Sequence, residues 1–430
     1  MKYTIPKGTF DIVPQAQNEK ERWKDSGLWQ KIEELIRNTV SSYGFQEIRT
    51  PVFEQSSLFH RSVGEATDII SKEMYEFEDR GGRSICLRPE GTAPVMRAYV
   101  ERAMHHHSPV SKLFYIGPMF RYERPQAGRF RQHHQFGAEA IGVASAEQDV
   151  EIIDLLYTVY SRIGLQNLSV QINSIGDHKS RKLYREALTS YLKPHLNSLS
   201  EDSQRRLEQN PLRILDSKNP SDKEILTGAP SILDFLGPES KDRFELVKTR
   251  LTQLGIPFTV VPSLVRGLDY YNETVFEIVS GELGAQNSIG GGGRYDGLIK
   301  TLGGPDLPAV GFGTGLERIL QTALGQNVAF TPTPGPIVFF IPLGVNALTH
   351  CVSLLHQLRE ENLHVEMDYS GRKLGKVMSY ADNINSQYVA VVGDQEIANN
   401  SIELKHMKSG EKTAFSLEGF SEQIKKLAKG

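Results

Sequence analysis

The stretch FRYERPQAGRFRQHHQFGAE, residues 120–139, decides the fold because it predicts two long strands joined by a polar turn. Strand character continues outward on both sides, so the predicted hairpin spans 112–141. Its turn is the segment 124–129, which contains proline and glycine and carries no apolar residue larger than alanine. A hairpin of this length predicts the centre of a sheet.

One face of this hairpin is polar, because side chains alternate between the two faces of a strand. The residues of that parity are Arg121 and Glu123 on the outgoing strand and Arg131, His133, Gln135 and Glu139 on the returning strand. A solvated sheet face accounts for the pattern. A hydrated substrate-binding surface on the sheet accounts for the mixture of Arg, Glu, Gln and His at least as well, so both interpretations stay open.

Segments before the hairpin predict a helix and an interrupted strand. The segment 28–43 carries apolar residues at helical spacing and is followed by Gly44, which favours a helix end. The run FQEIRTPVFE, 45–54, is strand-like but contains Pro51. Because proline removes a donor from the ladder, this strand is expected at a sheet edge or at a subunit junction.

Composition divides the rest of the chain. The segment 178–254 is charged and locally amphipathic, which predicts a helical insertion between 1–177 and 255–328, the two parts of one domain. The segment 329–335 predicts a stiff linker. In 336–430, apolar runs alternate with helical stretches, which predicts a small α/β domain with a largely parallel sheet.

Bulk properties exclude several classes of protein. The 430 residues exceed one compact domain, and two distant cysteines without a CxxC pair argue against a disulfide framework and against a zinc site. No apolar run reaches the length of a membrane span and the N-terminus does not resemble a signal peptide, so a cytoplasmic protein without a membrane partner is expected. The net charge of −3 excludes only a non-specific, backbone-driven binder of nucleic acid.

The glycine-rich run 290–293 lacks the marks of the common phosphate-binding loops. It has no GKS or GKT ending, and a GxGxxG reading lacks the helix and the downstream acid. A cluster of glycines instead indicates a tight bend or a close approach of backbone. In a sheet, it would let a flat substrate lie against the strands.

Three arginines in apolar or glycine-rich surroundings suit a polyphosphate site. They are Arg121, Arg266 and Arg318. Arg318 falls in the first turn of a predicted helix, where a cation opposes the helix dipole and calls for an anionic partner. The adjacent Glu317 diverges from it on a helix and is not expected to be that partner. Each arginine alone is equally well an ion-pair residue.

The run 105–107, three consecutive histidines, does not predict a metal site. Consecutive residues of a helix point in different directions, so the three imidazoles are not expected to share one ion. A solvated stretch is the preferred interpretation, and no metal-ligating residue is predicted anywhere in the chain.

Together these segments resemble the histidyl-tRNA synthetases, a family of class II aminoacyl-tRNA synthetases. GFQEIRTPVFEQ resembles the first class II motif, residues 120–139 the second and GFGTGLERIL the third. LVRGLDYY and GGGGRYDGL resemble the two signatures peculiar to the histidine enzymes, and LRPEGTAP also fits. The resemblance runs from Lys7 through the C-terminal domain. It implies an α+β catalytic domain on a mainly antiparallel sheet, with a helical insertion and a C-terminal α/β domain that binds the anticodon.

The resemblance implies roles toward ATP for four residues. Arg121 would bind the α-phosphate and the substrate carboxylate, and Arg318 the γ-phosphate. Arg266 would stabilise charge on the α-phosphate during attack, and Glu123 would hold the adenine amino group. Catalysis of this kind needs positioning and positive charge rather than a protein nucleophile.

It also implies a histidine pocket. The residues assigned to histidine binding are Glu90, Gly91, Thr92, Arg121, Gln135, Glu139, Arg266, Tyr270 and Tyr271. Among them Glu90, Thr92 and Gln135 would hold the α-amino group. Glu139 and Tyr271 would read the imidazole, which offers one donor and one acceptor. An apolar amino acid would leave these buried polar groups unpaired, and no editing domain is recognisable.

The implied substrates are ATP with Mg²⁺, L-histidine and tRNA(His), without zinc, and the implied assembly is a homodimer. His133 departs from the phenylalanine that the family usually places against the adenine ring. An imidazole stacks there with less area, and its protonation would make ATP affinity depend on pH. In the hairpin turn, Gln126 and Arg129 resemble the loop that reads the acceptor end of the tRNA.

Two other functions are alternatives to an aminoacyl-tRNA ligase. One is a non-catalytic paralogue that serves as a histidine-sensing regulatory subunit of ATP phosphoribosyltransferase, and the other is an RNA-binding module without catalysis. The paralogues lose residues that bind ATP and lack the anticodon domain. This chain keeps Arg121, Glu123, Arg266 and Arg318 and continues for about a domain beyond the linker.

Overall fold

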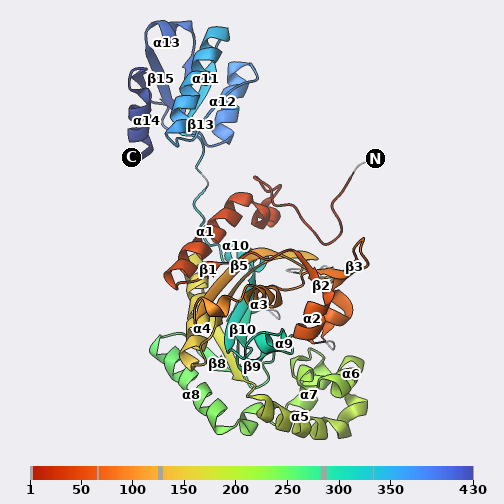
Figure 1. Cartoon of the computed structure of the whole chain (residues 1–430). Helices are drawn as coiled ribbons and strands as arrows, with labels where there is room; N and C mark the ends of the chain where they lie inside the picture. The colour runs from red at the N-terminus through yellow and green to blue at the C-terminus, as the bar shows by residue number, and fades with distance from the viewer. Residues whose placement is uncertain (1–2, 65–66, 124–128, 282–287, 333, 430) are drawn as a thin grey trace. The chain divides into compact units, whose positions relative to one another are not determined.

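A computed structural model describes residues 3–64, 67–123, 129–281, 288–332 and 334–429. The chain separates into two compact units, Met1–Phe330 and Thr331–Gly430, each with its own sheet and cores (Figure 1). The predicted boundaries of the two catalytic segments, the insertion and the linker stay predictions, although the division between the units falls inside the predicted linker.

The first unit is built on an eight-stranded sheet with the order β1-β5-β6-β11-β10-β9-β7-β8. Neighbouring strands are antiparallel except for the pairs β1–β5 and β7–β8 at the two ends. This confirms the predicted α+β fold on a mainly antiparallel sheet. The strands are β1 Gln46–Glu47, β5 Ser111–Phe120, β6 Gln132–Ile141, β7 Leu168–Ser174, β8 Phe258–Val260, β9 Asn272–Ser280, β10 Ser288–Arg294 and β11 Ala309–Gly315.

The predicted hairpin is confirmed as β5 and β6. Phe120 pairs with Gln132 at the end of the ladder next to the turn, and Ser111 pairs with Ile141 at the opposite end. Most of the predicted turn, 124–128, lies outside the described residues. The hairpin lies between β1 and β11, so it supplies one half of the central floor.

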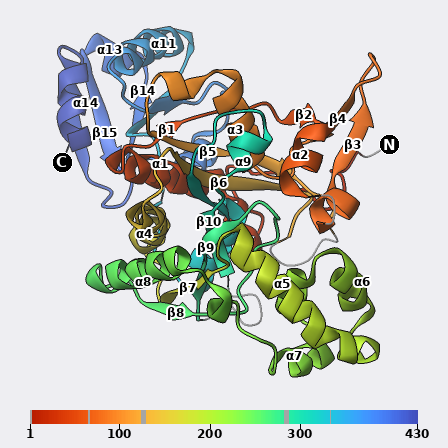
Figure 2. The same ribbon diagram turned by 60° about the horizontal axis from the view of Figure 1, so that its bottom comes forward.

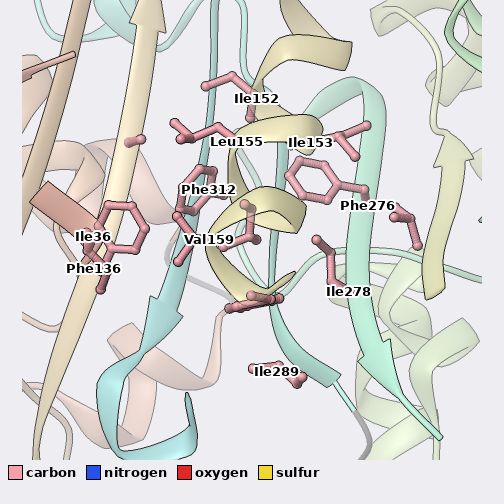
Figure 3. Close-up of a cluster of buried hydrophobic side chains, with 14 of the residues drawn as sticks. Ile36, Phe136, Ile152, Ile153, Leu155, Val159, Phe276, Ile278, Ile289 and Phe312 are labelled. Atoms are coloured by element: carbon pink, nitrogen blue, oxygen red, sulfur yellow. The ribbon is translucent and has the colours of Figure 1, made fainter. Parts of the chain in front are cut away.

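The apolar parity of these strands forms the main core. Figure 3 shows Phe136, Phe312 and Phe276 from three strands, facing Leu155 and Val159 of a helix. Burial of each such side chain contributes about 1.5–3 kcal/mol. The helices α1 Ser26–Ser42, α4 Ala146–Ile163 and α10 Leu316–Gly325 share this core with α8 Pro238–Gln253, which is described below.

Helix α1 confirms the helix predicted for 28–43. The side chain of Asp25 accepts the N–H of Gly27 at 2.8 Å and so caps its first turn. Its buried residues Ile32, Ile36 and Val40 recur every four positions, which places one stripe against the sheet. The helix stops just before Gly44, whose positive φ of 78° suits a residue without Cβ.

Pro51 separates β1 from β2, and both of these short strands lie at sheet edges, as predicted. Strand β2 begins a three-stranded sheet with the order β2-β4-β3, packed with α2 and α3. The elements of this region are β2 Phe53–Gln55, α2 Ser56–Val63, η2 Ile69–Glu73, β3 Tyr75–Glu78, β4 Ser84–Leu87, α3 Thr92–Glu101 and η3 Met104–His106; the remaining short elements of the unit are η1 Glu19–Lys24 and α9 Leu298–Thr301.

The segment 178–254 is helical, as predicted, but its packing divides it. The helices α5 to α7 lie together in Figures 1 and 2, whereas α8 lies apart from them and packs on α4. Phe244, Val247 and Leu251 of α8 belong to the main core. The elements are α5 His178–Leu192, η4 Lys193–Ser198, α6 Glu201–Gln209, η5 Pro211–Asp216, α7 Pro220–Leu226, η6 Ile232–Phe235 and α8 Pro238–Gln253.

The second unit has a five-stranded sheet with the order β13-β12-β14-β15-β16. Its first three strands are parallel, but β15 and β16 are antiparallel additions, so the prediction of a largely parallel sheet is wrong for this edge. The short link between β15 and β16 permits only a hairpin. The elements are β12 Val338–Pro342, α11 Val345–Glu360, β13 Val365–Met367, α12 Leu374–Asn383, β14 Tyr388–Val392, α13 Asp394–Ala398, β15 Ser401–His406, β16 Lys412–Ser416 and α14 Phe420–Lys429.

Candidate active site

The sheet face opposite the main core carries many glycines. Strand register places Gly137, Gly313 and Gly291 side by side across β6, β11 and β10. The glycines of this face, here called the glycine floor, are Gly117, Gly137, Gly291, Gly293, Gly311, Gly313 and Gly315. The cluster is therefore a close approach of backbone and not the tight bend that was the alternative.

Side chains of neighbouring strands lie flat over this floor. A Cβ on Gly311 would overlap the carboxylate of Glu139, and one on Gly313 would overlap the amide of Gln135. A Cβ on Gly137 would overlap the ring of Tyr115, which also lies against Gly91. The polar face of the hairpin is thus the floor of a lined site, and the alternative of a solvated sheet face is wrong where Glu139 is fully buried.

Two buried carboxyl groups lie beside this floor. Glu90 is 2% exposed, and its two oxygens accept the backbone N–H groups of Thr92 at 2.7 Å and Ala93 at 2.8 Å, at the start of α3. Glu139 accepts a hydrogen bond from the Thr92 hydroxyl at 2.8 Å and another from the phenol of Tyr295. Thr92 therefore joins the two carboxyl groups into one network.

Burial raises the pKa of Glu139 to about 8, although the hydrogen bonds from Tyr295 and Thr92 act in the opposite direction. Burial also raises the pKa of Glu90, against its backbone donors. With this pKa, the Glu139 carboxyl is mostly protonated at neutral pH and its ionised form is also accessible. It can donate to, or accept from, an imidazole in the pocket.

Aromatic rings close the pocket around Glu139. The ring centroids of Tyr270 and Tyr271 are 4.7 Å apart, and Tyr295 lies 5.4 Å from Tyr270. Gln135 donates to the Tyr115 hydroxyl at 3.2 Å. Burial raises the pKa of each of these four phenols, so they stay protonated and act as hydrogen-bond donors.

Tyr115 and Tyr295 are site residues that sequence reasoning missed. Tyr115 pairs directly with Gly137 across the hairpin, so the parity argument applied to the outgoing strand predicts it. Tyr295 lies inside the GGGGRYDGL signature, so the resemblance contained the signal that could have identified it.

The three arginines of the predicted polyphosphate site have anionic or carbonyl partners. Arg121 donates through Nε to the Pro89 carbonyl oxygen at 2.8 Å. Arg266 forms an ion pair with Glu277, a carboxylate of β9 that sequence reasoning also missed. Burial lowers the pKa of Arg318, as does Arg129, while Glu277 raises it. Glu277 is thus within electrostatic reach of both Arg266 and Arg318.

Glu123 and Arg129 form an ion pair of 3.2 Å at the base of the hairpin turn. Glu123 is also 3.9 Å from Arg121. A line of alternating charge therefore connects the hairpin to the floor. Gln126, the other predicted tRNA contact, lies outside the described residues.

Glu317 has its partner on β6 rather than on its own helix. Its Oε1 accepts the backbone N–H of His134 at 2.8 Å and lies 2.9 Å from the Nδ1 of that ring. The ring of His134 also meets Trp29 edge-on, at 4.9 Å between centroids. The His134 side chain thus lies on the core side of the sheet, and the His133 side chain lies on the side of the glycine floor.

Burial lowers the pKa of His133 to about 3, and the positive charge of Arg121 acts in the same direction. The imidazole is therefore neutral throughout the physiological range. A pKa this low argues against an ATP affinity that depends on protonation of His133, and that dependence stays a prediction.

We expect His133→Phe to leave the KM for ATP unchanged within about twofold, or to lower it, since a neutral ring is replaced by a larger one. Steady-state pyrophosphate exchange at varied ATP measures this, at pH 6 and at pH 8. His134→Phe is the matched control, because it removes the ring contact with Glu317, keeps the backbone hydrogen bond to it and leaves the floor unchanged. A rise of more than about tenfold in the KM of the His133 variant would refute the assignment of its ring to ATP.

No group of three or more His, Cys, Asp or Glu side chains is arranged to hold a metal ion within the described parts of the chain. His106 and His107 are exposed, and His105 is half-buried. In the same residues, no helix is long and apolar enough to span a bilayer.

An antiparallel floor with a motif-bearing hairpin, a glycine-rich strand and an arginine at the start of α10 defines the class II aminoacyl-tRNA synthetases. The family model "Histidyl-tRNA synthetase" matches residues 24–319, and the model "Anticodon binding domain" matches 338–427. The chain therefore belongs to the histidyl-tRNA synthetase family.

Individual relatives cover the whole chain. It is 60% identical to the histidine–tRNA ligase of Protochlamydia amoebophila, over 99% of this chain and all of the relative, and 47% identical to that of Bacillus licheniformis, over 99% of each. The crystal structure of apo S. aureus histidyl-tRNA synthetase matches with a TM-score of 0.83 at 38% identity, covering 99% of this chain and all of that one.

Proposed function

We propose that this chain is a histidine–tRNA ligase, which activates L-histidine with ATP and transfers it to tRNA(His). The observation that carries the proposal is the buried carboxyl of Glu139, held by Thr92 and Tyr295 beside a glycine floor and a line of arginines. Relatives at 60% and 47% identity bear this name over their whole length, which favours the ligase over the regulatory paralogue.

The imidazole of histidine is recognised by Glu139 with Tyr271, and Tyr270 and Tyr295 line the same pocket. A group whose pKa is near 8 can pair with either nitrogen of the ring. An apolar side chain of similar size would leave a buried carboxyl and several phenols without partners. Such mismatches reject a competitor by about 10⁴–10⁵ where the site is built for hydrogen bonds.

The main-chain groups of histidine meet the second carboxyl. Each oxygen of Glu90 accepts only one backbone donor and keeps a lone pair for an ammonium group. Thr92 and Gln135 lie beside it and complete the ammonium site, and Gly91 leaves room for the substrate backbone. Arg121 and Arg266 face the carboxylate.

Activation is an in-line displacement. An oxygen of the histidine carboxylate attacks the α-phosphorus of ATP, the bond to the bridging oxygen breaks, and pyrophosphate leaves. Arg121 and Arg266 stabilise the charge that builds on the α-phosphate, and Arg318 holds the γ-phosphate. Glu123 binds the adenine amino group, and the His133 ring stacks on the base. Transfer then follows, when a terminal ribose hydroxyl of the tRNA attacks the carbonyl carbon and AMP leaves.

Mg²⁺ fits this site as a companion of ATP. It requires only one or two protein carboxylates when phosphates supply the other ligands. Glu277, which forms an ion pair with Arg266 and acts electrostatically on Arg318, would provide such a carboxylate. When bound, the ion neutralises phosphate charge, while the arginines orient the same oxygens.

The remaining assignments are also proposals. The anticodon-binding unit is 336–430, joined by the linker 329–335 to a catalytic domain formed by 1–177 and 255–328. Gln126 and Arg129 contact the acceptor end of the tRNA. The protein acts as a homodimer in the cytoplasm.

Histidine-dependent exchange of pyrophosphate into ATP tests the proposal. The purified chain should catalyse exchange with histidine and not with other amino acids, and it should charge tRNA(His). The regulatory paralogue would bind histidine without exchange, and an RNA-binding module would do neither. Absence of exchange by folded protein with Mg²⁺ present would sink the proposal.

A further inference from the structure

The loop 261–271 carries Arg266, Tyr270 and Tyr271 but forms no regular ladder. It leaves the sheet at the end of β8 and rejoins it at β9. Strand pairing does not fix these residues. They are held by apolar packing around Leu264 and Tyr271, by the ion pair of Arg266 with Glu277, and by hydrogen bonds from other elements.

The start of the loop is anchored within the catalytic sheet. Asn173 of β7 is fully buried, and its Nδ2 donates to the carbonyl oxygens of Pro262 and Leu264, both at 3.0 Å. This anchor lies on the N-terminal side of Arg266.

The end of the loop is anchored by the helical insertion. Arg181 of α5 donates through Nη1 to the Tyr271 carbonyl oxygen at 2.6 Å. Asn210, which precedes η5, donates to Asp269 at 2.8 Å. From the catalytic side, the N–H of Asp269 donates to the Val63 carbonyl at 3.1 Å. Asn272, which follows Tyr271, pairs with Arg294 of β10 and donates to the Asp296 carbonyl at 2.7 Å.

A cavity of about 450 Å³ separates the insertion from the loop at this point. Arg181, Arg185 and Arg213 line it from the insertion, and Arg266, Asp269 and Tyr271 line it from the loop. Side-chain packing is incomplete across such a space. The Arg181 and Asn210 hydrogen bonds cross it, beside the hydrophobic cluster that the insertion and the loop share, and they hold the end of the loop near Tyr271.

We propose that Arg181, assisted by Asn210, is a positioning residue for histidine activation: through the carbonyl of Tyr271 it sets the place of the phenol that reads the imidazole. The helical insertion thereby takes part in amino-acid recognition without touching the amino acid. This inference rests on the proposed ligase function.

The variant Arg181→Met keeps the length of the side chain and removes its donors. In pyrophosphate exchange we expect the KM for histidine to rise about tenfold or more, as for loss of a charged hydrogen bond, with the KM for ATP unchanged within about twofold. Arg181→Lys should recover most of the loss, because an ammonium can donate to the same carbonyl.

Arg185→Met is the matched control. Arg185 lies one turn further on the same face of α5 and, like Arg181, acts electrostatically on Asp269, but its Nη2 donates to the Gln209 carbonyl at 3.0 Å, within the insertion. It therefore controls for the lost charge without loss of the bond to Tyr271. It should leave both KM values unchanged. Asn210→Ala should raise the KM for histidine less than Arg181→Met does, and the double variant should show less than the product of the two effects, since both bonds hold one loop.

Histidine binding to the full chain, measured by calorimetry without ATP, separates the possible failures. If the wild-type chain exchanges pyrophosphate but Arg181→Met binds histidine normally, the positioning role is refuted and the ligase stands. The role is equally refuted if Arg181→Met and Arg185→Met weaken histidine and ATP alike, or if Arg181→Lys gives no recovery. If the Met variant does not fold, Arg181→Lys and Asn210→Ala decide by the same comparison. If the folded wild type does not exchange, the proposed function itself fails.

Discussion

Arg266→Ala should slow histidine-dependent pyrophosphate exchange by about 10²–10³ while changing histidine affinity by less than about fivefold. The guanidinium is largely shielded from solvent, forms an ion pair with Glu277 and lies 5.8 Å from the Tyr271 ring centroid. In the proposed mechanism, its charge stabilises the negative charge that builds on the α-phosphate. A group that acts mainly in the transition state lowers kcat when it is lost, rather than substrate binding.

Rapid-quench measurement of the activation step, together with calorimetric binding of histidine, tests this. Arg266→Lys keeps the charge but loses the forked geometry, so an intermediate rate is expected. Arg250→Ala is the control, because Arg250 pairs with Glu147 on an exposed surface at 3.2 Å. Equal losses of binding and of activation in Arg266→Ala would refute the catalytic role.

Arg294→Met should lower the free energy of unfolding of the first unit by about 3–5 kcal/mol. Arg294 and Asp149 are both fully buried and form an ion pair that joins the end of β10 to α4. Asp149 also accepts the Thr274 hydroxyl at 2.8 Å. Removal of the guanidinium leaves a carboxyl group in the core without its principal counter-charge.

Denaturant unfolding followed by tryptophan fluorescence measures this loss. The chain has two tryptophans, Trp23 and Trp29, and both lie in the first unit, so the signal does not report the second. The double variant Arg294→Met with Asp149→Leu should recover much of the stability, because neither charge is then left alone. Additive losses in the double variant would contradict this account.

The sequence predicted the features that depend on local pattern. Strand parity and the Pro51 interruption predicted the hairpin and the edge strands, and the motif resemblance predicted the antiparallel sheet and the family. These follow from the period of two along a strand and from the missing donor of proline. They require no knowledge of which strands are neighbours.

The features that were missed depend on neighbours distant in sequence. Tyr115 is an exception, because strand parity indicates it. Glu277 enters the site through register, and the low pKa of His133 follows from desolvation beside Arg121. The insertion is divided because the apolar face of α8 packs in the main core instead of against the other helices of the insertion. Spacing along the chain does not encode these contacts.

The glycine floor limits how the amino-acid preference of this enzyme can be redesigned. A pocket lined by side chains is enlarged by trimming them, but a floor of bare backbone has nothing to trim. Any substitution at Gly311 or Gly313 adds atoms where Glu139 and Gln135 already lie. Variants that accept bulkier analogues of histidine must therefore be sought in the walls, at Tyr270 or Tyr295, and libraries that randomise the floor are expected to yield inactive proteins.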